Sequence, residues 1–243
     1  MRRMAAFVIG GVALLVAWTP GAGARPGVGV PPGLERVVFV DHGVTSSARP
    51  SAGAMSTDFS LLGGHPSWPA SSTVHYSVNV GGCTDDCGKA VTAVDKAFNE
   101  WEISGITFTR ATTGDPDPCG GTDSLSWTPI DGPGGILAET FVCRTLTSHE
   151  IVGFQTLFDS GDPWSDSGAA GHFDIQATAT HEEGHSMGFD HVRAPRDARL
   201  TMYPYLTEGD IGFRTLGCGE LLGVNALYGR SLVCVANVTV PLD

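Results

Sequence analysis

The chain has 243 residues and a formal net charge of −12, with 14 lysines and arginines against 26 aspartates and glutamates. A chain of this length is most simply one domain with extensions, and its negative charge disfavours binding to nucleic acid or to an anionic membrane surface. Beyond the N-terminal region, no segment of the sequence is apolar enough to span a bilayer.

The N-terminal residues have the pattern of a secretory signal peptide. Arg2 and Arg3 precede an apolar run over residues 4–18, and three small residues follow at 22–24. A transmembrane helix is disfavoured because the run is short and because glycines and a proline interrupt the region. We therefore expect residues 1–24 to be a signal peptide and the mature protein to be secreted to the extracellular space.

The six cysteines all follow the expected cleavage site, and an even number in an exported chain favours disulfides over reactive thiols. The sequence does not decide the connectivity, but proximity along the chain favours three local pairs, Cys83–Cys87, Cys119–Cys143 and Cys218–Cys234. The alternative, in which Cys83 and Cys87 bind zinc, is weaker because no second pair of Cys or His lies at finger-like spacing.

Residues 25–68 are rich in proline, glycine, alanine and serine and show no sustained apolar periodicity. This composition is typical of a linker or a propeptide. The catalytic domain is then expected to span residues 69–243. Its first strand is predicted at residues 73–80, where valines and a tyrosine alternate with polar side chains.

A helix is predicted over residues 86–103, because apolar side chains recur there at helical spacing. Thr84 or Asp85 is the expected N-cap, and Gly105 is the expected terminator. The stretch 114–134 is rich in glycine, proline and aspartate and is predicted to be a surface loop. Strands before and after a helix favour an α/β fold with a mixed sheet. The further predicted strands are at residues 106–112, 135–143 and 150–158.

The segment ATHEEGHSMGFDH, at residues 179–191, is the strongest functional signal in the chain. Asp174 can cap a helix that runs into this segment, and residues four apart on a helix lie on the same face. His181 and His185 therefore point together, and two neutral imidazoles at this spacing can bind one Zn²⁺. A tetrahedral ion held in this way is short of one protein ligand and keeps one open position.

Three further residues of this segment complete the predicted centre. Gly188 can take a left-handed conformation that ends the helix and turns the chain, so that His191 becomes the third ligand. Glu182 lies one helical step round from the ligands, where it can accept a proton from a zinc-activated water and act as the general base. Glu183, the next residue, is expected to be solvated.

The segment RLTMYPYL places Met202 eleven residues after His191 in a short connection. HExxHxxGxxH followed closely by Met-Tyr-Pro resembles the metzincin clan of zinc peptidases and, within it, the matrixin family. The stretches GILAET, FDIQATATHEEGHSMGFDH, TMYPY and RTLGCGELLGVNALYG also follow one another in the order seen in bacterial matrixin-like secreted proteases. The resemblance covers about residues 69–229.

This resemblance implies an α+β zincin fold, in which a mixed twisted sheet packs on helices. The active-site helix carries HExxH, and a Met-turn and a C-terminal helix follow it. The resemblance also implies zinc binding by the three histidines and a general base at Glu182. Met202 would form a hydrophobic floor under the ligands. The wall of the pocket that receives the residue after the scissile bond would be Tyr203, Pro204 and Tyr205.

The chain departs from the family pattern at several positions. Val192 stands where matrixins usually have serine, and Gly219 and Glu220 stand where two adjacent aspartates are common. No cysteine precedes Cys83, so no thiol in the N-terminal segment can occupy the zinc. If that segment keeps the enzyme latent, it must act differently.

If the N-terminal segment keeps the enzyme latent, Asp41 or His42 is the candidate group that would occupy the zinc. The alternative is that the segment is a plain linker.

Additional metal sites are weaker hypotheses. Asp159, Asp162 and Asp166 have a spacing that could serve Ca²⁺, although acidic surface loops are common. His172 resembles part of a second, structural zinc site of animal matrixins, but its partners are not evident and a surface histidine is the alternative. We therefore predict one catalytic Zn²⁺, with Ca²⁺ as an open alternative.

We expect a secreted zinc-dependent endopeptidase that acts as a monomer on protein or peptide substrates, with neither nucleic acid nor membrane as a partner after signal removal. An exported zinc-binding protein without turnover is one alternative, but zinc binding alone does not require Glu182. A zinc hydrolase that acts on a non-peptide bond is another, since the same centre would serve it. Comparing a protein substrate with simple esters and amides distinguishes these hypotheses.

Overall fold

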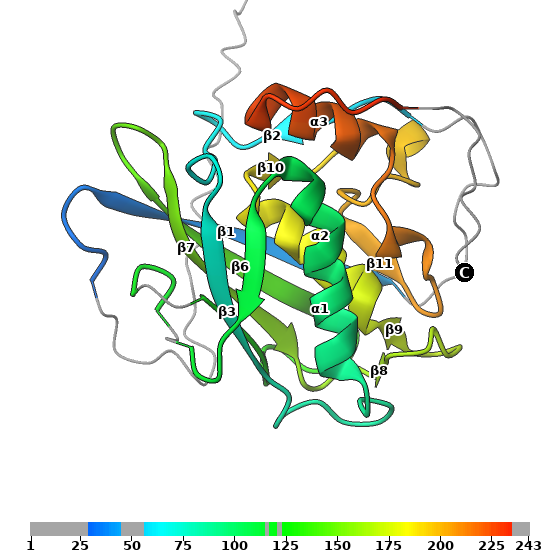
Figure 1. Cartoon of the computed structure of the whole chain (residues 1–243). Helices are drawn as coiled ribbons and strands as arrows, with labels where there is room; N and C mark the ends of the chain where they lie inside the picture. Colours follow the sequence, from blue (N-terminus) through cyan, green and yellow to red (C-terminus); the bar gives the residue numbers. More distant parts are fainter. Residues whose placement is uncertain (1–28, 45–55, 115–116, 121–122, 235–243) are drawn as a thin grey trace, which may run out of the picture.

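The computed structural model describes residues 29–44, 56–114, 117–120 and 123–234, so the expected signal peptide lies outside the described residues. Two helices lie side by side against one face of a seven-stranded sheet, and a third lies beside two short strands (Figure 1). The helices are α1 (Ala90–Trp101), α2 (Ile175–Ser186) and α3 (Cys218–Tyr228). The strands of the main sheet are β1 (Leu34–Val44), β3 (Thr73–Asn79), β4 (Thr107–Arg110), β5 (Asp123–Thr128), β6 (Ile136–Thr145), β7 (Ile151–Asp159) and β11 (Tyr205–Thr207). The short strands are β2 (Ser60–Leu61), β8 (Trp164–Ser165), β9 (Phe173–Asp174) and β10 (Phe189–Asp190).

The main sheet has the strand order β11-β1-β6-β7-β5-β3-β4. Strands β3, β4, β5 and β7 run parallel to one another, and β6 is antiparallel to both of its neighbours, β7 and β1. The strand β1 is in turn parallel to β11. The predicted α/β class with a mixed sheet is therefore confirmed.

The strand β1 lies inside the sheet, although it belongs to the segment whose composition indicated a linker or propeptide. It pairs with β6 over residues 34–42 and with β11 over residues 42–44. Ordered structure therefore begins well before residue 69, and the assignment of residues 25–68 as a linker or propeptide stays a prediction. Its apolar run, VVFV, is short and lies among glycines and prolines, which hid it in the composition.

The strands predicted around residues 73–80, 106–112, 135–143 and 150–158 correspond to β3, β4, β6 and β7. The prediction of a loop over residues 114–134 is wrong at β5, whose sequence DSLSWT contains only two apolar residues. The buried residues of this strand are Asp123, Leu125 and Trp127. Pairing with β3 and β7 on either side stabilises this strand, so its local sequence alone gives little signal.

Helix α1 begins at Ala90, later than predicted, with Lys89 as its N-cap residue and no side-chain cap. The reason is local, because the disulfide between Cys83 and Cys87 closes a turn ahead of the helix. The chain then passes through a 3-10 turn, Glu102–Ser104, and Gly105 ends it with a φ of 87°, as the sequence predicted.

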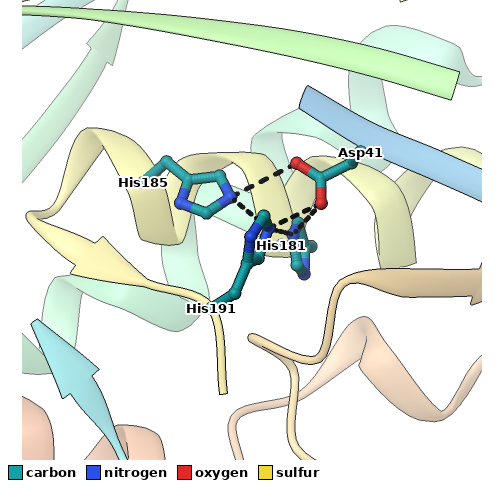
Figure 2. Close-up of side chains that lie close together, drawn as sticks. All are labelled: Asp41, His181, His185 and His191. Carbon is teal, nitrogen blue, oxygen red and sulfur yellow. Dashed lines mark hydrogen bonds and ion pairs between the residues drawn. The ribbon is translucent and has the colours of Figure 1, made fainter. Parts of the chain in front are cut away.

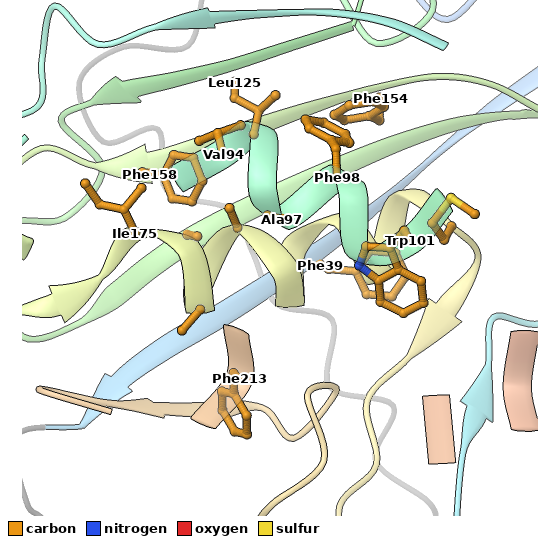
Figure 3. Packing of buried hydrophobic residues seen from close by; sticks show 14 of the residues in the cluster. Phe39, Val94, Ala97, Phe98, Trp101, Leu125, Phe154, Phe158, Ile175 and Phe213 are labelled. Atoms are coloured by element: carbon orange, nitrogen blue, oxygen red, sulfur yellow. The ribbon is translucent and has the colours of Figure 1, made fainter. Parts of the chain in front are cut away.

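The apolar face of α1 carries the centre of the core. Phe98 and Trp101 are fully buried, and the Trp101 indole N–H donates to the Thr180 carbonyl of α2 over 2.9 Å. Burying one such large side chain stabilises the fold by about 1.5–3 kcal/mol. This contact packs α2 against α1, and α2 also packs against the sheet. Figure 3 shows the neighbouring buried side chains, among them Phe39, Val94, Ala97, Leu125, Phe154, Phe158 and Ile175.

Three disulfides form in the described part of the chain, and their pairing is the one that proximity predicted: Cys83–Cys87, Cys119–Cys143 and Cys218–Cys234. The alternative of Cys83 and Cys87 as zinc ligands is therefore wrong. Among the described helices, none has both the length and the apolar character needed to cross a membrane.

Candidate metal centre

The ends of helix α2 are set by local chemistry. The Asp174 carboxylate accepts the Ala177 N–H over 2.9 Å, which confirms the predicted N-cap, and the Arg214 guanidinium pairs with the same carboxylate. Gly188 follows the helix with a φ of 90°, a conformation that L side chains rarely adopt. A Cβ at this glycine would also lie 2.1 Å from the Pro66 carbonyl oxygen, so no larger residue fits the turn.

Four buried side chains converge at the middle of the molecule: His181 and His185 from α2, His191 from the segment after it, and Asp41 from β1 (Figure 2). The Nε2 atom of His191 lies 3.3 Å from that of His181 and 3.1 Å from that of His185. Among the described residues, no other group of three His, Cys, Asp or Glu side chains brings its ligand atoms so close together.

The Asp41 carboxylate closes the fourth side of this cluster. Its Oδ1 atom lies 3.1 Å from Nε2 of His181 and 2.6 Å from Nε2 of His191, and its Oδ2 atom lies 3.3 Å from Nε2 of His185. Ligands placed about 2.0–2.1 Å from a tetrahedral ion are about 3.3 Å from one another. Three imidazoles and a carboxylate are also ligands that zinc accepts, so the residues fit this metal in both spacing and chemistry.

Backbone carbonyls orient two of the imidazole rings. Nδ1 of His181 lies 2.5 Å from the Thr201 carbonyl oxygen, and Nδ1 of His185 lies 3.0 Å from the Phe189 carbonyl oxygen. When these nitrogens donate, the opposite Nε2 atoms keep their lone pairs for a metal. Burial lowers the pKa of His185 to about 4, which keeps that ring neutral. Burial also acts to lower the pKa of His181, but the Asp41 carboxylate outweighs it and raises this pKa to about 9.

Glu182 lies on α2 directly beside the cluster and is fully buried. Its Oε2 atom accepts a hydrogen bond from the Thr140 hydroxyl of β6 over 2.7 Å, and Thr140 contacts the Thr156 hydroxyl of β7 over 2.9 Å. Its Oε1 atom has no hydrogen-bond partner among the described residues. Burial raises the pKa of Glu182 well above its usual range, and the neighbouring Asp41 carboxylate raises it further.

Glu183 is also fully buried, so the expectation that it faces solvent is wrong. The reason is that α2 packs against both α1 and the sheet, and eleven of its residues are buried. The Glu183 carboxyl accepts the Ser186 hydroxyl over 3.0 Å, and burial raises its pKa well above the usual range.

The sequence pattern of the matrixin family matches residues 67–229, which is more than half of the chain. The chain belongs to the matrixin family. Horse interstitial collagenase is 30% identical over 181 residues, which cover 72% of this chain and 35% of the collagenase. Human neutrophil collagenase is 28% identical over 179 residues (71% and 36%), and human matrix metalloproteinase-20 is 30% identical over 190 residues (76% and 37%). The matched region thus spans about a third of the length of these relatives.

Matrixins are zinc metalloendopeptidases, and the region of this matrixin that matches the family contains the three histidines and Glu182. The match begins after β1. Asp41 therefore comes from a part of the chain that the family pattern does not include, and the sequence offered it only as one of two candidates for latency. The other candidate, His42, is exposed and lies 3.4 Å from the Gly135 carbonyl oxygen through Nδ1.

The predicted Met-turn packs against α2. Met202 is buried, and a Cβ at Gly184 would lie only 2.2 Å from its sulfur, so the glycine between the two helix histidines makes room for it. The Met202 N–H donates to Oε1 of Glu220 over 3.0 Å, and its carbonyl accepts the Val192 N–H over 3.0 Å. Sequence reasoning noted Glu220 only as a departure from the family pattern and missed this role.

The predicted pocket wall lies alongside β1. The ring centroids of Tyr203 and Tyr205 are 5.8 Å apart. Tyr205 pairs with His42 of β1 in the sheet. Pro204, the residue between the two tyrosines, is buried. A surface hollow of about 620 Å³ lies elsewhere, next to His191. Its lining includes none of the three wall residues. Their role in substrate binding stays a prediction.

The three acidic residues considered for Ca²⁺ do not form one group. The Asp159 carboxylate accepts four backbone N–H groups, from residues 130, 131, 132 and 161, and Asp162 accepts the Gly134 N–H. Asp166 instead accepts the Lys89 N–H near α1. Calcium binding therefore stays a prediction, without Asp166 in the group.

His172 is partly exposed, and its Nδ1 lies 3.1 Å from the Ala170 carbonyl oxygen. Within the described ranges it joins no cluster of metal-binding side chains, so nothing supports a second zinc there.

Proposed function

We propose that this matrixin is a secreted zinc-dependent endopeptidase that hydrolyses peptide bonds in protein substrates. The observation that carries the proposal is the convergence of three histidine Nε2 atoms beside the buried carboxyl of Glu182, within the segment that matches the family. His181, His185 and His191 would hold one zinc ion. When bound, zinc supplies a Lewis acid that polarises a peptide carbonyl and makes a water molecule more acidic.

Glu182 would move the proton during hydrolysis. Its Oε1 atom has no partner among the described residues, which leaves this atom available to accept a proton from the attacking water. The same carboxyl then donates the proton to the leaving amine nitrogen as the C–N bond breaks, and the other product is a carboxylic acid. The Thr140 hydroxyl, bound to Oε2, would keep the carboxyl in one orientation throughout.

Further parts of the proposal concern Met202, the pocket wall, secretion and the domain bounds. Met202 would pack beneath the ligands, where Gly184 leaves room for its sulfur. The wall of the pocket for the residue after the scissile bond would consist of Tyr203, Pro204 and Tyr205. Secretion is supported by the three disulfides, because such bonds persist mainly in oxidising compartments. We retain residues 1–24 as the signal peptide, 25–68 as a linker or propeptide-like segment that includes β1, and 69–243 as the catalytic domain.

Casein hydrolysis tests the proposal in protein that has been cut between residues 44 and 56 and separated from β1, because Asp41 of that strand closes the fourth side of the cluster. The wild-type sequence is compared with Glu182→Ala, and Glu183→Gln is a matched control on the same helix. We expect Glu182→Ala to retain one zinc per chain but to lose at least about 100-fold in rate, as expected when a general base is removed. Glu183→Gln should retain both zinc and activity. Chelation should abolish hydrolysis, and added zinc should restore it.

An exported zinc-binding protein without turnover is a second candidate, because Asp41 fills the position that a catalytic zinc site keeps open. It would be favoured by a protein that holds one zinc but cleaves no casein, either as the full chain or after removal of β1. A hydrolase of non-peptide bonds would instead cleave simple esters while leaving casein intact.

A further inference from the structure

We propose that Asp41 is the fourth zinc ligand while β1 remains part of the chain, and that β1 keeps substrate out by filling the position of an extended peptide between β6 and β11. This inference rests on the proposed zinc-peptidase function. It assigns to β1 a role that the matched family region does not contain.

The environment of Asp41 requires a positive partner. Its carboxylate is completely buried, and within the described part of the chain its ion-pair contacts are the three candidate zinc ligands, with no lysine or arginine among them. An isolated carboxylate in such a place would cost several kcal/mol, so a cation at the centre of the four side chains accounts for its burial. Three imidazoles and one carboxylate then complete a tetrahedral shell.

The strand β1 is anchored on both sides of Asp41, since residues 42–44 on the C-terminal side pair with β11. On its N-terminal side, Glu35 pairs with Arg144 over 2.5 Å and Arg36 pairs with Asp117 over 2.9 Å. The register of β1 with β6 also shifts by one residue between Asp41 and His42. Such an irregularity changes the direction of neighbouring side chains and is frequent next to active sites.

The side chains of β1 that face inward match the surface below them. The Phe39 ring stacks on the imidazole of His185, with ring centroids 3.9 Å apart and planes within 8°. Gly43 lies against Phe173, and a Cβ at this glycine would be 2.4 Å from the Phe173 ring. Phe39, Asp41 and Gly43 therefore form a continuous cover over the candidate metal centre.

The same strand occupies the backbone groups that a peptide would use. β1 pairs antiparallel with β6 and parallel with β11, so both neighbouring strands have their hydrogen-bonding edges covered at the candidate centre. Extended peptides commonly bind by adding a strand to an exposed sheet edge. A protein substrate in extended form can therefore reach the metal and Glu182 only after β1 has left this position.

The test is metal access in the full chain, with Co²⁺ in place of zinc and acetohydroxamate as the probe. Asp41→Asn removes the negative charge but keeps the shape of the side chain. Val40→Thr is the matched control, because Val40 is adjacent on β1 but partly exposed on the opposite face. The cobalt absorption spectrum reports coordination directly and needs no turnover.

We expect wild type and Val40→Thr to resist acetohydroxamate, and Asp41→Asn to bind it on the order of 100-fold more tightly, since a tethered ligand competes at a high effective concentration. Equal binding by wild type and Asp41→Asn would overturn the inference. If Asp41→Asn does not fold, cutting wild type between residues 44 and 56 and removing the released strand should give the same opening.

The two proposals fail in different ways. Failure of all variants to bind one Co²⁺ would contradict the zinc site itself and with it both proposals. A protein freed of β1 whose metal is accessible to acetohydroxamate but which cleaves no casein would contradict the peptidase proposal and support the role of Asp41 and β1.

Discussion

Glu220 connects the Met-turn to the C-terminal helix, and its replacement by alanine should destabilise both. The carboxylate is 1% exposed. Its Oε1 atom accepts the Met202 N–H over 3.0 Å, and its Oε2 atom accepts the Gly217 N–H over 2.9 Å at the start of α3. Both N–H groups lose this acceptor when the carboxylate is removed.

The magnitude follows from these two contacts. Leaving one buried N–H without a partner costs about 1–3 kcal/mol, and the loss of the side chain adds a smaller packing cost. Glu220→Ala should therefore lower the free energy of unfolding by about 3–5 kcal/mol. Glu220→Gln keeps one acceptor oxygen and should cost about 1–2 kcal/mol, because its amide group cannot accept the second N–H.

Urea unfolding of the zinc-loaded protein measures these changes, in a Glu182→Ala background that prevents self-digestion. Glu150→Ala is a suitable control, since that side chain is exposed and should change the free energy by less than about 0.5 kcal/mol. A loss below about 1 kcal/mol in Glu220→Ala, similar to that of the control, would refute the bridging role.

Other predictions concern the proton path, a buried acid and the seating of β1. Thr140→Val removes the hydroxyl that holds Glu182. In protein freed of β1 it should lower kcat for casein about tenfold at unchanged zinc content, and an unchanged kcat would contradict the positioning role. Burial raises the pKa of Asp123 from 3.8 to about 7, so its folded form retains a proton that the unfolded chain releases. The free energy of unfolding should therefore fall by about 4 kcal/mol at most between pH 4 and pH 7, and Asp123→Asn should lose this part of the pH dependence in urea titrations. If the free energy of unfolding depends on pH with the same slope in wild type and Asp123→Asn, the raised pKa of Asp123 is contradicted. Gly43→Val forces side-chain atoms into the buried Phe173 ring and should weaken the packing of β1 over the candidate centre. Acetohydroxamate binding should then rise several-fold although all four candidate metal ligands are unchanged. Binding as weak as in wild type would contradict the tight fit of β1.

Helix α2 and its histidines could be predicted from sequence because every signal they need is local. Asp174 caps the helix by accepting the N–H of a residue only three positions later. The two helix histidines are one turn apart, and Gly188 provides the left-handed turn. The disulfides are local in the same sense, since each joins cysteines that are neighbours along the chain.

The parts that sequence reasoning missed depend on contacts between distant segments. The strand β1 is defined by pairing with β6, about a hundred residues further along, and no periodicity within residues 34–44 reveals its partner. Burial of Glu183 depends on α1 covering the other side of α2. Spacing placed Asp159, Asp162 and Asp166 together, but the turn after Trp164 carries Asp166 away to α1.

The central position of β1 also affects how the protein behaves once this strand is gone. In the folded chain its backbone pairs with β6 along nine positions and with β11 along three. Loss of the strand leaves two unpaired edges facing each other, and such edges pair readily with other chains. A preparation that begins after residue 44 should consequently be more prone to self-association during refolding and storage than the full chain. Adding back a peptide of residues 29–44 should restore its solubility.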